Sequence, residues 1–396
     1  MSVKVVPLYF PQLHAIPEND AWWGKGFTDW DNVRRGTPGF PGHHQPRVPL
    51  GGSYYDQSKP EVIRRQVELA KAHGIHAFCH YHYWFDGKQL LETPTNLFMA
   101  AKDLDFHFLL AWANETWSKR WDGLDHHILQ LQTHPPDKAR WELHFQYLIK
   151  AWTDERYLRI DGKPVFLIYR STKIQELANM LDYWKERAHA YGLPGLYFCA
   201  IDQSRPPPPE LLPLFDAVML FQPFVSYFGR LQQPEPWEVR AVAELRRRTP
   251  RFADPLMQKL ADRVAKPTLV DYDAVWKEIV EAPRSGSYTE LLGGFVDWDN
   301  TARYRNRATV YVGATPHRFE YWMKRLLERA KENREQEQLV FINAWNEWSE
   351  GAYLEPDERN GHGWLEALSR AIVAANQPAH RAAEPSRPLR NGLWKR

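Results

Sequence analysis

Short apolar runs rich in β-branched and aromatic residues recur along the whole chain of 396 residues. Most are continuous rather than alternating, a pattern typical of parallel strands that are covered on both faces. The pattern predicts eight strands, at residues 3–10, 76–84, 107–114, 164–170, 196–203, 217–224, 293–300 and 339–348.

Amphipathic stretches between these runs predict helices at residues 60–72, 137–152, 174–191, 273–282 and 316–331. Gly74 and Gly192 follow two of them, at the position where glycine commonly ends a helix. Eight strands alternating with helices predict an α/β fold, a single-domain (β/α)8 TIM barrel over residues 1–376. The alternative is a doubly wound sheet, which usually has fewer strands and a glycine-rich phosphate-binding turn.

Two predicted connections are unusually long, one over residues 11–58 after the first strand and one over 225–291 after the sixth. A long loop at a barrel mouth is commonly functional, so we expect the first to contribute to a site. Residues 377–396 are basic and rich in proline, and we expect them to form a tail outside the barrel.

Composition narrows the class of protein. A hydrophobic content of 43% allows a large core, and 51 basic against 49 acidic residues give no general attraction to nucleic acid. Cys79 and Cys199 fall in predicted strands and are expected to be free thiols in a reducing compartment. The N-terminus reads as a strand rather than a signal peptide, and no run is apolar over the width of a bilayer, so we expect a cytoplasmic protein.

The aromatic content is high, with 18 Trp, 18 Tyr and 19 Phe. Many of these rings stand beside polar residues at predicted strand ends rather than inside apolar runs. Sugars have flat C–H faces that stack on such rings, so the pattern indicates a carbohydrate cleft. Packing in the core is the alternative, and it must account for many of the rings.

The last predicted strand leads directly into carboxylates, in the segment FINAWNEWSEGAYLE at residues 341–355. Glu347 and Glu350 are three residues apart, beside Trp345 and Trp348. Chemistry at a glycosidic bond needs one acid to protonate an oxygen and a second to act as base or nucleophile. The alternative is a pair of surface charges on a helix. The preceding apolar strand favours a catalytic pair, because barrels carry their chemistry at the carboxyl ends of strands.

Other predicted strand ends carry hydrogen-bonding groups beside rings, which is the composition of a site for a polyhydroxylated ligand. His80 and His82 have the H-x-H spelling of a metal site in some barrel hydrolases, but later strand ends supply no histidine, so we expect neither a metal nor a cofactor. Asn114 and Glu115 form a second candidate acid site, for which we prefer a role in substrate binding.

Six stretches resemble the WbsX-type family, a group related to family 99 glycoside hydrolases. They are YFPQLHAIPENDAWWGKGFTDW, FCHYHYWFDGKQLLE, AWANETWSKRWDG, GKPVFLIYR, FVDWDNTARYRNR and NAWNEWSEGAYLEP, which together span about nine-tenths of the chain. The resemblance implies a (β/α)8 barrel and sugar chemistry, often within gene clusters for surface polysaccharides, where members are labelled glycosyltransferases. Together with the strand ends it gives the candidate substrate-binding residues Tyr9, Gln12, His14, Trp30, His80, His82, Tyr83, Trp84, Trp112, Asn114, Glu115, Trp117, Tyr169, Gln222, Asp299, Asn300, Arg303, Asn346, Trp348 and Glu355.

Family 99 hydrolases carry a related N-E-W-x-E motif, and the resemblance implies the same roles here. Glu347 would deprotonate the sugar 2-hydroxyl, which attacks the anomeric carbon to give a 1,2-anhydro sugar. Glu350 would act as acid and then as base, with net retention and no covalent enzyme adduct. Ser349 stands where the hydrolases usually have histidine, so mannose specificity does not transfer.

Three hypotheses for function follow. The first is a retaining, endo-acting glycoside hydrolase on a bacterial surface polysaccharide or its lipid-linked precursor. The second is a glycosyltransferase or transglycosylase in O-antigen or exopolysaccharide assembly; the triplet Asp297-Trp298-Asp299 has the spelling of a nucleotide-sugar metal site, although such triplets are common by chance. The third is a non-catalytic carbohydrate-binding barrel. The expected partner is an oligosaccharide or polysaccharide, with contact to a lipid-linked glycan as a further expectation.

Overall fold

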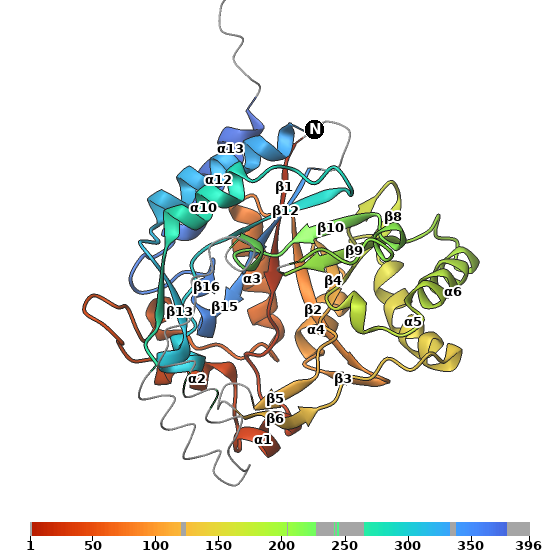
Figure 1. Ribbon diagram of the computed structural model, residues 1–396, viewed down its shortest axis with the longest axis horizontal. Coiled ribbons are helices and arrows are strands. Elements are labelled where there is room, and N and C mark those ends of the chain that lie inside the picture. The colour runs from red at the N-terminus through yellow and green to blue at the C-terminus, as the bar shows by residue number, and fades with distance from the viewer. Residues whose placement is uncertain are drawn as a thin grey trace, which may run out of the picture.

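The computed structural model describes residues 2–119, 124–203, 205–226, 241, 244, 265–332 and 338–377. Its centre is a closed ring of parallel strands (Figure 1), in which β14 lies between β12 and β1 and completes the circle. The eight strands are β1 (Lys4–Tyr9), β2 (Ala77–Phe85), β4 (His107–Trp112), β8 (Lys163–Ile168), β9 (Tyr197–Asp202), β10 (Ala217–Leu220), β12 (Glu290–Phe295) and β14 (Leu339–Asn343). All eight overlap the predicted strands, and the predicted (β/α)8 TIM barrel is confirmed.

Helices cover the outside of the ring, with α10, α12 and α13 together on one side and α5 and α6 on another (Figure 1). They are α3 (Pro60–Ala72), α4 (Thr93–Ala100), α5 (Lys138–Trp152), α6 (Leu177–Ala190), α10 (Tyr272–Glu281), α12 (Pro316–Lys331) and α13 (Gly363–Asn376). All five predicted helices are present. Gly74 and Gly192, at φ 79° and 80°, adopt the left-handed conformation that glycine favours after a helix.

The strands are buried on both faces, which explains their continuous apolar runs. In β4 the side chains from Phe108 to Ala111 are all fully buried. Alternate side chains point into the barrel or outward against the helices. Trp152 and Trp184 contribute large rings to the outer layer between α5 and α6 and the barrel.

Loops at the carboxyl ends of the strands build a rim around one end of the barrel. The connection after β1 contributes α1 (Pro17–Trp23), α2 (Asp29–Arg35) and the 3₁₀ turn η1 (Leu50–Gly52), and the connection after β4 contributes the hairpin β5 (Trp117–Lys119) and β6 (Leu124–Gln130). Further short elements are β3 (Lys88–Leu90), β7 (Arg159–Ile160), η3 (Ser171–Lys173), η4 (Leu212–Leu214), α7 (Phe224–Ser226), β11 (Thr268–Asp271), α11 (Thr301–Tyr304), η7 (Arg305–Arg307), β13 (Thr309–Val312), β15 (Asn346–Glu347), η8 (Trp348–Glu350) and β16 (Ala352–Tyr353).

Two predictions fall mainly outside the described residues: the course of the long connection at 225–291 and the tail at 377–396. Within the described ranges, no helix combines the length and apolar character needed to cross a membrane.

Candidate active site

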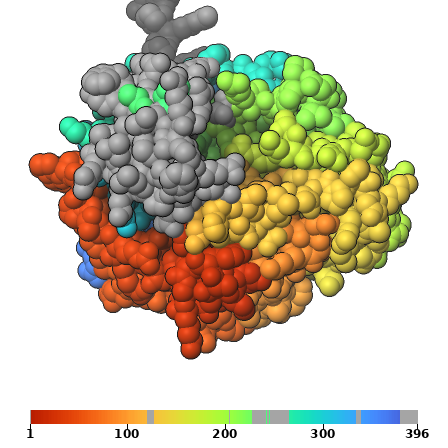
Figure 2. All heavy atoms as spheres, turned by 60° about the horizontal axis from the view of Figure 1, so that its bottom comes forward, coloured from red at the N-terminus to blue at the C-terminus, as the bar shows by residue number. Residues whose placement is uncertain are grey.

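A cavity of about 400 Å³ opens at the carboxyl end of the barrel. Its wall combines side chains from β2, η8 and the segment after β8 with others from α1, α11 and the hairpin β5–β6. Figure 2 looks toward this end and shows a hollow bordered by segments coloured yellow to green. The predicted location of the site, where the strands end, therefore agrees with the position of the cavity.

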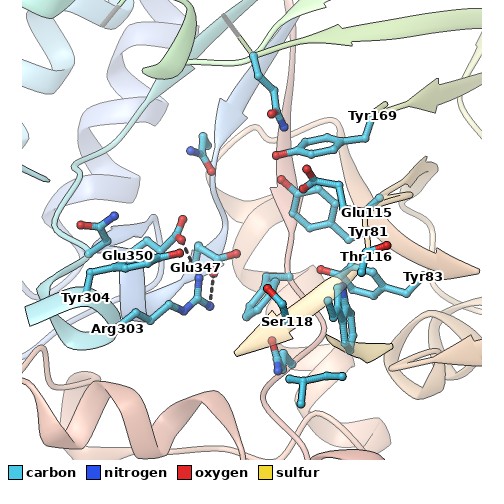
Figure 3. Close-up of a pocket in the computed structure, with 18 of the residues that line it drawn as sticks. Tyr81, Tyr83, Glu115, Thr116, Ser118, Tyr169, Arg303, Tyr304, Glu347 and Glu350 are labelled. Atoms are coloured by element: carbon cyan, nitrogen blue, oxygen red, sulfur yellow. Dashed lines mark hydrogen bonds and ion pairs between the residues drawn. The ribbon is translucent and has the colours of Figure 1, made fainter. Parts of the chain in front are cut away.

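Glu347 and Glu350 lie side by side on one wall of this cavity (Figure 3). Asn346 fixes the chain at this point, because its side chain accepts a hydrogen bond from the Phe10 amide (2.8 Å) and donates one to the Phe10 carbonyl (2.9 Å). Gly351, at φ 68°, then turns the chain back into β16 immediately after Glu350. The acid pair is thus held by the bend after the first strand as well as by its own segment.

Arg303 connects both glutamates. Its two terminal nitrogens donate to Glu350 Oε1 and to Glu347 Oε1, each at 2.7 Å. The same guanidinium also binds Asp29, at 2.9 Å to Oδ2, and the Ser349 hydroxyl donates to that oxygen at 2.5 Å. One cation is therefore shared by three carboxylates from the first and last loops of the barrel.

Burial and this imbalance of charge together determine how the pair titrates. Burial raises the pKa of Glu347 well above its usual range; Arg303 opposes the rise, while the charges of Glu350 and Asp29 add to it. The pKa of Glu350 is raised by burial as well, again against the effect of Arg303. The pair therefore retains a proton at a pH where an exposed glutamate is ionised.

The two carboxyl groups differ in access to the cavity. The Glu347 side chain is 7% exposed and that of Glu350 is 20% exposed. No hydrogen bond from the described residues reaches Oε2 of either glutamate. Each acid thus has one oxygen fixed by Arg303 and one oxygen open to a ligand.

Tyrosines and a third acid form the opposite wall (Figure 3). Tyr81 and Tyr83 from β2 and Tyr169 after β8 line the cavity, and burial raises the pKa of all three phenols well above the usual range. They remain neutral hydrogen-bonding groups. Glu115 accepts a hydrogen bond from Arg170 at 2.7 Å, and both side chains are more than a third exposed.

Nine of the predicted residues line the cavity. Besides Glu347 and Glu350, they are Gln12, Tyr83, Glu115, Trp117, Tyr169, Asn300 and Arg303.

Four other predicted residues instead face the helices outside the barrel. Tyr9 donates to Gln66 of α3, and His80 contacts Thr95 of α4. His82 packs against α5, where its Nε2 lies 2.9 Å from that of His144, while the Trp84 ring stacks on His144. Burial lowers the pKa of His80 and of His82 to about 3, so both are neutral.

A buried ion-pair cluster contains Asp299, beneath the rim. Arg47 lies 2.9 Å from Asp297 and 3.4 Å from Asp299. The Asp299 carboxylate is also hydrogen-bonded to His43 and Gln45. Although burial acts to raise the pKa of Asp299, His43 and Arg47 hold it below its usual range. Both carboxylates of the D-x-D triplet are therefore engaged within the protein rather than presented to a metal.

Glu355 belongs to a second buried cluster. It accepts hydrogen bonds from Tyr55, Gln66 and Trp348 at 2.6 to 2.8 Å, and Trp30 packs against Trp348 with ring centres 5.5 Å apart. These side chains support the segment that carries the acid pair and do not line the cavity.

The remaining predicted residues also lie behind the wall. Trp112 donates a hydrogen bond to the Trp84 carbonyl. The Asn114 side chain donates to the Arg170 carbonyl and accepts from the Arg170 amide. Gln222 accepts from the Ser226 amide. His14 is buried, and burial lowers the pKa of its ring.

Sequence reasoning missed several residues of the cavity wall. Tyr81 alternates with His80 and His82 along β2, so its side chain enters the barrel when theirs leave it. Asn19, Trp22 and Trp23 form one stripe on α1, a spacing of three and four residues that identifies a single helix face. Asn19 is fully buried, and neither its oxygen nor its nitrogen has a hydrogen-bond partner among the described residues.

Within the described part of the chain, no group of three or more His, Cys, Asp or Glu side chains is arranged to hold a metal ion.

The closed barrel with an acid pair at its carboxyl end defines a glycoside-hydrolase-like TIM-barrel protein. The chain belongs to the family described as Glycosyltransferase WbsX, whose model matches residues 5–368. The resemblance drawn from the motifs is thereby confirmed.

Relatives and solved structures agree with this assignment. The chain is 35% identical over 388 residues to the uncharacterized protein WxcX from two strains of Xanthomonas campestris pv. campestris, covering 98% of this chain and 52% of theirs. It thus spans about half the length of the curated relatives it matches.

Two solved structures share the fold at 13% identity. One is the GH99 endo-alpha-mannosidase from Bacteroides thetaiotaomicron with Bis-Tris-propane, with a TM-score of 0.52 over 94% of this chain and 96% of that one. The other is a glycoside hydrolase-like protein, with a TM-score of 0.54 over 94% of both chains. The fold and the family together support a carbohydrate-active enzyme.

Proposed function

We propose that this protein is a retaining glycosidase that acts within chains of a bacterial surface polysaccharide or its precursor, with Glu347 and Glu350 as its catalytic acids. The observation that carries the proposal is the shared guanidinium of Arg303, which fixes one oxygen of each glutamate at 2.7 Å and leaves the other oxygen toward the cavity. The tyrosine wall opposite supplies rings and neutral hydroxyl groups for a sugar.

The first step uses both acids. Glu347, as carboxylate, takes the proton of the sugar 2-hydroxyl, and that oxygen attacks the anomeric carbon. Glu350 delivers its proton to the departing glycosidic oxygen as the bond to the anomeric carbon breaks. The products are a 1,2-anhydro sugar and the released alcohol.

The second step reverses these proton transfers. Glu350, now a carboxylate, takes a proton from water while the water oxygen attacks the anomeric carbon. The three-membered ring opens, and the 2-oxygen recovers its proton from Glu347. Two inversions at one carbon give net retention.

The raised pKa of the pair supports the retention of a single proton near neutral pH, which the first step requires. The pKa shifts alone do not assign that proton to Glu350, since the pKa of Glu347 is raised the more. Arg303 contributes by stabilising whichever glutamate is ionised. Access supports the assignment of Glu350 as the acid, since it is the more exposed of the two.

The test compares the wild type with Glu347→Gln, Glu350→Gln and the control Glu186→Gln, which alters an exposed glutamate on the outer helix α6. Each protein is incubated with a panel of purified bacterial surface polysaccharides, and new reducing ends are measured. We expect cleavage by the wild type and by the control, and a loss of at least about 10³-fold in both active-site variants, because an acid or base contributes about 10²–10⁴-fold.

The same assay separates the alternatives. Proton NMR of the first product should show retained anomeric configuration, and a 2-deoxy substrate should be inert. Cleavage of the 2-deoxy substrate would indicate direct attack by a carboxylate. Unchanged turnover by Glu350→Gln would refute the assignment of Glu350 as a catalytic acid.

Transfer to a sugar is the second candidate, and the name of the family favours it. The same 1,2-anhydro intermediate gives a transglycosylation product when a sugar hydroxyl replaces water. A longer glycan formed from two oligosaccharides would identify this reaction, whereas a requirement for a nucleotide sugar would identify a conventional transferase.

A further inference from the structure

A second cavity of about 580 Å³ is lined by α11 and by the turn η7 that follows it. The two cavities share three lining residues, Trp23, Arg303 and Tyr304. The two cavities therefore adjoin each other at these three residues. Nothing in the proposed chemistry at Glu347 and Glu350 requires this additional space.

Among the described residues, every charged side chain in the wall of this second cavity is cationic. Arg35, Arg305 and Arg307 line it together with Arg303, and no aspartate or glutamate is among its described lining residues. The surrounding polar groups, which include Asn32, Thr37 and Thr301, are amides and hydroxyls. In a protein whose total charge is only +2, this is a strong local concentration of positive charge.

The side chains of two of these arginines have no partner in the described part of the protein. The side chains of Arg35 and Arg305 make no hydrogen bond or ion pair with another described residue, and both residues are exposed. Arg34, the neighbour of Arg35 on α2, differs because its guanidinium lies 4.1 Å from the centre of the Tyr54 ring. The last turn of a helix favours basic residues, which explains why both Arg34 and Arg35 are cationic. It does not explain why the cavity wall beside Arg35 has no acidic side chain among its described residues.

Arg305 is also held in an unfavourable backbone conformation. Its φ of 50° and ψ of −122° lie in a region that glycine adopts without strain and that other residues rarely adopt. An arginine at this position places a guanidinium on the cavity wall, although its backbone conformation is more strained than that of a glycine would be. Such strain commonly marks a functional position.

We propose that the second cavity binds an anionic group, phosphate or carboxylate, of the sugar substrate, with Arg35 and Arg305 as its ligands. The inference rests on the proposed function, because it assigns a charged neighbour to the glycosidic bond at the acid pair. Planar guanidinium groups bind both kinds of oxyanion through paired hydrogen bonds. The substrate class is thus an acidic or phosphorylated glycan rather than a neutral one.

The test measures binding directly, without turnover. Inorganic pyrophosphate, glucuronic acid and neutral glucose are titrated into the full chain by calorimetry at low ionic strength. We expect one or both anions to bind and glucose not to bind at this site. Preference for pyrophosphate identifies a phosphorylated substrate, and preference for glucuronic acid identifies an acidic sugar.

Variants locate the site. Arg35→Gln and Arg305→Gly should each weaken binding of the anion by about tenfold, because a charge-assisted hydrogen bond contributes that much or more. Arg34→Gln is the matched control and should bind as the wild type does. Arg305→Gly should also keep or raise the Tm, since it removes the strained backbone, so that lost binding cannot be attributed to unfolding.

The proposal is overturned if neither anion binds, or if Arg34→Gln weakens binding as much as Arg35→Gln does. Turnover of a neutral glycan without anion binding would refute this inference alone, whereas specific anion binding without turnover of any glycan would leave it standing and count against the proposed function.

Discussion

Replacing Arg303 with methionine should uncover the charge imbalance in the candidate active site. The guanidinium is 6% exposed and lies within 2.9 Å of Asp29, Glu347 and Glu350. Methionine retains much of the length and volume of the side chain but provides no charge. Removing one partner of a buried ion pair typically costs about 3–5 kcal/mol, because the remaining charge stays buried without compensation.

This cost should depend on pH. In the wild type both glutamates already have a raised pKa, so each disfavours folding once the pH exceeds the pKa of the unfolded glutamate, and this cost is absent below that pH. Loss of Arg303 removes the main influence that lowers both values. A one-unit rise in pKa adds about 1.4 kcal/mol to the difference for a carboxyl that is ionised in the wild type at neutral pH. Because the pair keeps one proton at this pH, only its ionised member contributes, and about 1.4 kcal/mol is expected. Acidification toward pH ~5 should remove most of that part.

The assay is chemical unfolding of wild type and Arg303→Met at pH ~7.5 and ~5. Arg329→Met is the control, since Arg329 is also buried but donates to the backbone carbonyls of Ile279, Val280 and Ala282 instead of to carboxylates. Its stability difference should be nearly the same at both pH values. If the difference in the free energy of unfolding between the wild type and Arg303→Met does not become smaller at the lower pH, the proposed role of Arg303 in lowering both glutamate pKa values is refuted.

Three further changes test other parts of the structure. Asn19→Leu removes a buried amide without described partners, so the free energy of unfolding should rise by about 1–3 kcal/mol while sugar binding weakens; a fall in stability would show that the amide is satisfied. Gly293→Ala would place a Cβ 1.9 Å from the Leu220 carbonyl oxygen and should reduce stability by at least about 3 kcal/mol, whereas Gly286→Ala, with open space around it, should leave the Tm unchanged. Glu355→Gln replaces an acceptor of three hydrogen bonds and should cost about 1–3 kcal/mol in unfolding experiments; a larger effect on kcat than on stability would instead place this residue in the reaction.

The barrel could be predicted from the sequence because its strands are covered on both faces and read as apolar runs. The same property concealed which side chains enter the barrel. In β2 the run is continuous, so nothing in the pattern shows that Tyr81 and Tyr83 face the cavity while His80 and His82 face the helices. A strand with one face in solvent would have alternated and revealed the direction.

The acid pair could be predicted because its two members are close in the sequence. Their shared partner Arg303 was recognised only as a polar group at a strand end, and Asp29 was not identified at all. Asp29 is 274 residues from Arg303, and its carboxylate becomes part of the site only through the three-dimensional path of the first loop. Local patterns carry no information about such a contact.

The position of β14 between β1 and β12 also has a consequence for how the protein folds. Until residues 339–343 insert, a partly synthesised chain has two unpaired strand edges and neither of its proposed catalytic acids. Arg303 meets Asp29 and Glu347 in their final arrangement only when the first and last strands have joined. Catalytic competence should therefore appear in a single late event of folding, and the onset of turnover during refolding would report the closure of the barrel.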